Sequence, residues 1–156
     1  MLVDVADLDC IYLSYDEPQK EEFWIEIQNL VPWAKRIDGV EGSDAAHKAA
    51  AAVSDTERFI LIDGDNIPDA NFFDLQLDIP KEYEDFVFRW KARNVINGLM
   101  YGNGGLSCWT REFVNNMQTH EATDGSDETV VEFCFDFRYK AMNNVYSTTY
   151  PNGDAY

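Results

Sequence analysis

Apolar residues in the first part of the chain form short continuous runs separated by turn residues. Three such runs, over residues 9–15, 33–37 and 58–62, have the length and composition of strands. The first and third are apolar along most of their length, which is typical of strands covered on both faces of a sheet. They predict three strands of one buried sheet.

Two helices are predicted between these strands. Acidic Asp16 and Glu17 before Pro18 suit a helix start, and Phe23 and Ile27 lie on its apolar stripe before Pro32 ends it. The second is an alanine-rich helix over 44–53 that Ser43 is predicted to cap. The resulting order, β-α-β-α-β, indicates an α/β domain with a mostly parallel sheet flanked by helices.

The second half of the chain is less regular. Strands are predicted over 86–90, 106–109 and 132–137, with a glycine loop over 101–105. Thr110 is predicted to cap a helix over 111–117. The tail from 148 to 156 is predicted to be irregular.

The net charge of the chain indicates which classes of partner it can bind. Asp and Glu number 29 against 12 Lys and Arg, a formal net charge of −17. Such a surface repels nucleic-acid phosphates and anionic lipid headgroups, so no direct nucleic-acid binding is expected. A local basic pocket and a bound metal cation remain compatible with it. The length of 156 residues, 46% of them hydrophobic, predicts a single domain over 1–156.

Cysteine usage and the termini bear on the compartment. Cys10, Cys108 and Cys134 are odd in number and widely spaced, so we expect buried thiols rather than disulfides or a zinc knuckle. No apolar run approaches the length of a membrane span, and the acidic N-terminus does not resemble a secretory signal. These features favour a reducing cytoplasm.

The most informative motif is Asp63-Gly64-Asp65, which follows the buried strand over 58–62. Residues i and i+2 of an extended chain point to the same side, so both carboxyl groups face one point at the carboxyl end of the strand. Ligands of open α/β sheets bind at that end. Converging carboxylates favour a hard cation, Mg²⁺ or Mn²⁺. An acidic turn after a core strand is the simpler alternative.

Three segments of the chain, among them the one with the Asp63-Gly64-Asp65 motif, resemble the GT-A glycosyltransferases. That family combines an N-terminal nucleotide-binding α/β half, an apolar strand ending in a DxD motif, and a glycine-bearing loop followed by a helix. The corresponding parts are residues 11–16, 59–65 and 103–112. The chain looks most similar to short glycosyltransferase-like proteins from bacteriophage and marine sequence collections. The resemblance covers roughly residues 8–135.

The resemblance implies a sugar-nucleotide donor, Mn²⁺ or Mg²⁺, and hexosyltransferase-like transfer to an unknown hydroxyl acceptor. It divides the single domain into a nucleotide-binding half over about 8–66, an acceptor-side half over about 67–147 and a tail over 148–156. Asp63 and Asp65 would be metal ligands. Asp65 also counts as catalytic, because the ion it holds would neutralise the diphosphate leaving group.

Four further residues are candidates for the nucleotide. Ser14, Tyr15 and Asp16 follow the first strand, where they can stack on a base or bind a ribose, although Tyr15 also fits a packing role. His47 lies near the start of the second helix, whose N-terminus attracts anions. A surface imidazole is the alternative reading of His47.

The acceptor-side half supplies the other donor contacts. Arg93, close to Lys91, is a candidate for a bidentate phosphate contact, or else a solvated strand end. Gly104 and Gly105 are candidates for backbone contacts to the sugar, and an ordinary turn is their alternative.

Two late residues complete the predicted site. His120 is a candidate for a further metal ligand, as GT-A enzymes often supply one late in the domain. Glu132 is the candidate base that would deprotonate the acceptor hydroxyl in an inverting transfer. Its rivals are Glu121, Asp124 and Asp127.

Two other functions remain open. One is a non-catalytic module that binds a sugar nucleotide or a partner with the same fold, which the short length after Glu132 favours. The other is a phosphatase of the haloacid-dehalogenase type, with Asp63 as nucleophile and Asp65 as acid. That motif normally lies near the N-terminus, whereas about sixty residues precede it here.

Overall fold

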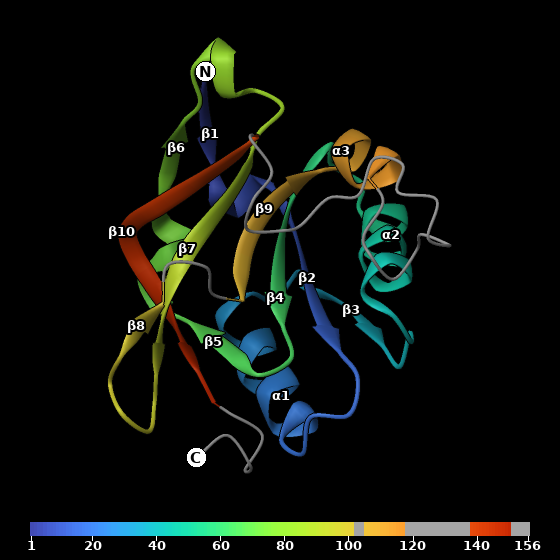
Figure 1. The fold of residues 1–156 in the computed structure, drawn as a ribbon, viewed down its shortest axis with the longest axis vertical. Coiled ribbons are helices and arrows are strands. Elements are labelled where there is room, and N and C mark those ends of the chain that lie inside the picture. Colours follow the sequence, from blue (N-terminus) through green and yellow to red (C-terminus); the bar gives the residue numbers. More distant parts are fainter. Residues whose placement is uncertain (102–104, 118–137, 151–156) are drawn as a thin grey trace, which may run out of the picture.

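A computed structural model describes residues 1–101, 105–117 and 138–150, and all structural statements below concern these residues (Figure 1). Their strands and helices follow in chain order: β1 (Leu2–Asp4), η1 (Val5–Asp7), β2 (Asp9–Ser14), α1 (Lys20–Leu30), β3 (Lys35–Asp38), α2 (Ser43–Val53), β4 (Arg58–Asp63), β5 (Asn66–Pro68), η2 (Ala70–Asp74), β6 (Gln76–Asp78), η3 (Lys81–Tyr83), β7 (Val87–Asn94), β8 (Met100–Tyr101), β9 (Leu106–Thr110), α3 (Arg111–Asn116) and β10 (Tyr139–Thr149). The described residues therefore have the α/β fold class predicted from the sequence.

One large sheet organises the fold. Its strand order is β3-β2-β4-β9-β7-β10-β5, with β8 paired to the side of β7, while β1 and β6 form a separate two-stranded sheet. β4 lies between β2 and β9, so the strand that carries the DxD motif is flanked on both sides (Figure 1).

The sheet is mixed rather than mostly parallel. β2 runs parallel to β3 and β4, and β10 runs parallel to β7. β9 is antiparallel to both of its neighbours, β8 is antiparallel to β7, and β5 is antiparallel to β10. The described residues between β7 and β9 contain the hairpin strand β8 and no helix, and a parallel return normally needs a longer crossover. The apolar pattern of a strand does not reveal its direction, which is why the expectation failed in this half.

The two faces of the sheet carry separate apolar clusters. On one face, Tyr12, Ile60 and Trp90 pack with the apolar stripe of α1. On the other face, Ile11 and Leu61 pack with residues of α2 and α3. The alternation along each strand thus produces a three-layer arrangement, with helices on both faces of the sheet (Figure 1).

Helix starts were predicted with mixed success. Thr110 caps α3 as expected, because its hydroxyl oxygen accepts a hydrogen bond from the backbone N–H of Phe113 at 3.0 Å. Ser43 is instead the first residue of α2, and Gly42 occupies the cap position with φ of 92°. Glycine tolerates this left-handed conformation, so the backbone rather than a side chain sets the start of α2.

The hydrophobic pattern of the sequence did not predict β10, the longest strand among the described residues. β10 runs from Tyr139 to Thr149, so the tail predicted to be irregular from 148 begins inside a strand. Polar residues interrupt its alternation, and its register against β7 shifts between Met142 and Tyr146. The strand predicted over 132–137 lies outside the described residues.

Cys10 and Cys108 are buried free thiols, as predicted, whereas Cys134 lies outside the described ranges. None of the helices within those ranges has the length and apolar composition that crossing a membrane requires.

Candidate functional site

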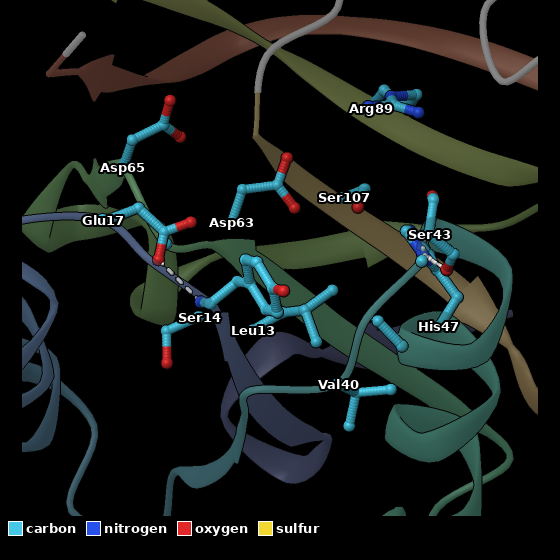
Figure 2. Close-up of a pocket in the computed structure, with 14 residues that line it drawn as sticks. Leu13, Ser14, Glu17, Val40, Ser43, His47, Asp63, Asp65, Arg89 and Ser107 are labelled. Carbon is cyan, nitrogen blue, oxygen red and sulfur yellow. Dashed lines mark hydrogen bonds between the residues drawn. The ribbon is translucent and has the colours of Figure 1, made fainter. Parts of the chain in front are cut away.

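A cavity of about 400 Å³ opens where β2 and β4 end beside the first turn of α2. Its lining comes from the β2–α1 segment, the start of α2, the DxD motif and the neighbouring strands β7 and β9: Leu13, Ser14, Tyr15, Glu17, Val40, Gly42, Ser43, Ala46, His47, Asp63, Gly64, Asp65, Arg89 and Ser107. Figure 2 shows the carboxyl groups of Asp63, Asp65 and Glu17 toward one side and Ser43 and His47 toward the other.

The sheet register explains why residues so distant in sequence meet here. Leu61 of β4 pairs with Ser107 of β9, and Ser107 pairs with Arg89 of β7. Paired residues share a face of the sheet, and so do residues two apart along a strand. Asp63, two residues after Leu61, therefore lies on the same face as Ser107 and Arg89. That face is the one on which α2 packs.

Hydrogen bonds fix the backbone on both sides of Gly64. The N–H of Asp63 donates to the carbonyl oxygen of Gly105 at 2.8 Å. The buried hydroxyl of Tyr12 donates to the carbonyl oxygen of Gly64 at 2.7 Å. These bonds hold the turn that follows β4, so its two carboxyl groups have a defined position before any ligand binds.

A second set of bonds holds Asp65. The amide of buried Asn66 donates to its carboxylate at 2.7 Å, and the N–H of Tyr150 donates to its carbonyl oxygen at 2.7 Å. The side-chain oxygen of Asn66 accepts hydrogen bonds from the hydroxyls of Ser147 at 2.9 Å and Thr149 at 3.0 Å. The end of β10 therefore supports the second carboxylate of the DxD motif. Asn66 was not recognised as a site residue from the sequence.

The carboxyl groups of the motif are electrostatically strained. The pKa of Asp63 is raised to about 7, mainly by loss of hydration; the Arg89 guanidinium lowers it, and the nearby carboxylates of Asp65 and Glu17 raise it. Loss of hydration is also the main cause that raises the pKa of Asp65. A cation placed between these groups would relieve the repulsion and favour their ionised forms.

Among the described residues, no three His, Cys, Asp or Glu side chains gather in a way that could hold a metal ion. Two carboxylates nevertheless fit Mg²⁺ or Mn²⁺ bound together with a phosphate-bearing substrate, because Mg²⁺ is usually held by one or two carboxylates plus substrate oxygens and waters. The raised pKa values and the shared cavity are therefore compatible with the predicted ion at Asp63 and Asp65.

The residues after β2 divide into two groups. Ser14 and Tyr15 line the cavity, whereas Asp16 is exposed and does not. The hydroxyl of Ser14 donates to Asp38 at 2.7 Å and accepts from Arg36 at 3.1 Å, so it organises the neighbouring strand end. Tyr15 is 44% exposed, which leaves its ring accessible to a ligand and disfavours the packing role considered above.

His47 lines the cavity and is buried, so it is not the surface imidazole of the alternative reading. Its Nδ1 lies 2.7 Å from the carbonyl oxygen of Ser43, and its ring packs edge-on against Trp109 with centroids 5.1 Å apart. These contacts attach the first turn of α2 to β9. The proximity of α2 to the sheet follows from the small residues Ala46 and Ala50, both buried.

The cavity receives its arginine from a different position of β7 than predicted. Arg93 is exposed, lies with its guanidinium 5.9 Å from the ring centre of Tyr146, and is not part of the lining. Arg89, four residues earlier on the same face, is buried and lines the cavity. The sequence does contain a signal for it: an arginine inside the run Phe88-Arg89-Trp90 alternates with core residues and must find a polar environment.

Gly105 lies against the motif itself. A Cβ atom at this position would collide with the Asn66 side chain and come within 2.9 Å of the Cβ of Asp63. Gly104, His120, Glu132 and the rival bases Glu121, Asp124 and Asp127 lie outside the described residues.

Comparison with known proteins adds little. No family model matches the chain, and no curated protein matches it. A solved structure of HddC from Yersinia pseudotuberculosis is similar with a TM-score of 0.48 and 12% identity over 91% of this chain and 93% of that one. A second HddC structure, complexed with GMP-PN, has a TM-score of 0.43 and 10% identity over 93% of this chain and 91% of that one. Because both TM-scores lie below 0.5, we base no inference on these similarities.

Proposed function

We propose that the protein is a metal-dependent glycosyltransferase of GT-A type that uses a nucleoside-diphosphate sugar as its donor. The observation that carries this proposal is the position of Asp63 and Asp65. Both line one cavity at the carboxyl end of a strand inside the sheet, and Ser14 and Tyr15, predicted to lie beside the nucleotide, line the same cavity.

In this proposal the two carboxylates hold a divalent cation against the diphosphate of the donor. The cation would act as a Lewis acid that neutralises the charge left on the diphosphate when the sugar–phosphate bond breaks. Tyr15, accessible at the cavity edge, can stack on the base. Asn66 keeps the carboxylate of Asp65 in place through its hydrogen bond.

In this proposal Arg89 takes the role near the donor phosphates that the sequence analysis predicted for Arg93. Its guanidinium lies on the cavity side of β7 and lowers the pKa of Asp63. It therefore favours the ionised carboxyl group that a cation requires, and it adds positive charge near the donor phosphates. Glu132 remains the proposed base on the basis of the family resemblance.

The proposal is tested by turnover of donor sugars. Nucleotide sugars with different bases and sugars are incubated with the protein and Mn²⁺, and release of nucleoside diphosphate is measured with and without EDTA. We expect release from at least one donor. EDTA should abolish it, and Asp65→Asn should reduce it at least about 100-fold, because one metal ligand becomes neutral. Asp74→Asn, which removes an exposed carboxylate outside the cavity, is the matched control and should retain activity.

The outcomes separate the candidate functions. Metal-dependent binding of a nucleoside diphosphate without any donor turnover would overturn the enzymatic proposal and select the non-catalytic module. Release that persists in EDTA and in Asp65→Asn would contradict the role of the DxD motif.

A further inference from the structure

Three cations follow one another along one face of β7. Arg89, Lys91 and Arg93 are spaced two residues apart, so their side chains leave the same face of the strand at intervals of about 7 Å. We call these three residues the cation row. Arg89 is buried, Lys91 is half-buried and Arg93 is exposed, so the row leads from the cavity out to solvent.

The strands around the cation row lack acidic residues. β7, β8, β9 and β10 contain no Asp or Glu, although the chain has 29 of them. On β10, Tyr146 pairs with Lys91 and Thr148 pairs with Arg93, so neutral side chains flank the row. These four strands therefore contribute no negative charge beside the row, although Arg89 lies close enough to the carboxyl group of Asp63, on β4, to lower its pKa.

The two outer cations differ in their contacts from four other cations of the chain, whereas Arg58, Lys81, Arg111 and Lys140 also form no ion pair with a described residue. Lys20, Lys35, Arg36 and Lys48 each form an ion pair with a carboxylate. Within the described ranges Lys91 and Arg93 form none, and the guanidinium of Arg93 lies instead near the ring of Tyr146. Protein carboxylates do not neutralise these charges there, which leaves them available to an external anion.

The row begins beside the reacting part of the proposed site. Arg89 lines the cavity together with Asp63, and β7 ends at the same edge of the sheet as β4 because both strands are antiparallel to β9. Backbone bonds join the two ends: the N–H of Val95 donates to Thr149, and the N–H of Tyr150 donates to Asp65. A molecule bound along Lys91 and Arg93 would reach the cavity from the side of β7.

We propose that the cation row binds an oxyanion group, a phosphate or a carboxylate, of the acceptor molecule. The assignment of this molecule as the acceptor rests on the proposed function, whereas the binding of an oxyanion does not. Lys91 and Arg93 would hold the anionic group outside the cavity, and a hydroxyl about one or two strand residues away would then lie near Arg89 and Asp63. The acceptor would thus be an acidic or phosphorylated molecule rather than a neutral one.

The test uses the full chain without nucleotide, stripped of metal with EDTA that is then removed by dialysis, so that the DxD carboxylates hold no metal and no other polyanion competes with the probes. Inorganic tripolyphosphate is titrated in one arm and citrate in the other, and backbone amide shifts are followed by ¹H–¹⁵N NMR at low salt. We expect shifts in residues 89–94 and 146–149 with at least one probe. Lys91→Gln combined with Arg93→Gln should weaken that binding at least about tenfold.

A matched double variant controls for net charge. Lys81→Gln with Lys140→Gln removes two positive charges near the opposite end of β7, where β10 begins, and should change the affinity less than about twofold. Arg93→Gln alone, at an exposed position, provides a second variant that does not perturb the core. A stronger response to tripolyphosphate would identify a phosphorylated acceptor, and a stronger response to citrate would identify a carboxylate.

Absence of shifts along β7 and β10 with both probes would overturn the inference, as would equal weakening by the two double variants. Because no metal or nucleotide is present, such a failure would leave the proposed donor site standing. Conversely, loss of donor binding in Asp65→Asn would be observed whether or not the cation row binds an anion.

Discussion

Replacing Asp63 by Asn should stabilise the metal-free protein at pH 8 by about 4 kcal/mol, from a pKa difference of about three units at about 1.4 kcal/mol each. The pKa of Asp63 is about 7 in the folded chain because of lost hydration, whereas an unfolded chain gives about 3.9. Ionisation therefore favours the unfolded state. Stability is complete below about pH 4 and is lost as the pH rises towards 7, and an amide avoids this loss.

Urea unfolding in EDTA at pH 5 and pH 8 measures this effect. The advantage of Asp63→Asn over the wild type should be larger at pH 8 than at pH 5, and Asp74→Asn, at an exposed position, should show no such trend. Addition of Mn²⁺ at pH 8 should stabilise the wild type and not Asp63→Asn. Destabilisation by Asp63→Asn at pH 8 would mean that its carboxyl group contributes to the fold rather than strains it.

Gly105→Ala should lower the free energy of unfolding by about 3 kcal/mol, the sum expected for overpacking and for lost hydrogen bonds. A Cβ atom here overlaps the side chain of Asn66 and lies 2.9 Å from the Cβ of Asp63. Asn66 is buried and bonds to Asp65, Ser147 and Thr149, so it cannot move without breaking those bonds. The substitution should also weaken metal-dependent nucleotide binding, because Asn66 holds Asp65.

Gly98→Ala is the matched control for this prediction. Gly98 has φ of 70° with nothing near its missing Cβ, so alanine there introduces only backbone strain, about 1 kcal/mol. Denaturant unfolding compares the two variants. A stability of Gly105→Ala within about 0.5 kcal/mol of the wild type would contradict the close approach of Gly105 to the motif.

The N-terminal half of the fold was predicted well, because each of its strands and helices has one clear hydrophobic periodicity. The predicted runs over 9–15 and 58–62 and the stripe of Phe23 and Ile27 correspond to β2, β4 and α1, with strand ends that differ by one residue. The predicted parallel direction holds for β2, β3 and β4, but the antiparallel direction of β9 and the bulged, polar strand β10 were not predicted. Both depend on pairing between distant residues, such as Tyr146 with Lys91, which leaves no local periodicity.

The site could be predicted only as far as the β-α-β-α-β order of the first half and the local DxD pattern determine it. Asp63 and Asp65 lie where the i and i+2 rule and the end of a strand place them, and Ser14, Tyr15 and His47 share their cavity. Arg89 and Asn66 were missed because their roles depend on the register of β7 against β9 and of β5 against β10. A run of strand residues shows that Arg89 needs a polar environment, but only the assembled sheet shows that this environment is the cavity.

Calorimetric titration with nucleoside diphosphates, with and without Mn²⁺, tests most directly whether Asp63 and Asp65 bind a cation that in turn binds a diphosphate. The account predicts that at least one nucleoside diphosphate binds in the presence of Mn²⁺, that EDTA abolishes this binding, and that Asp65→Asn weakens it at least about 100-fold while Asp74→Asn does not. Binding of equal affinity with and without Mn²⁺, or unchanged binding by Asp65→Asn, would contradict it.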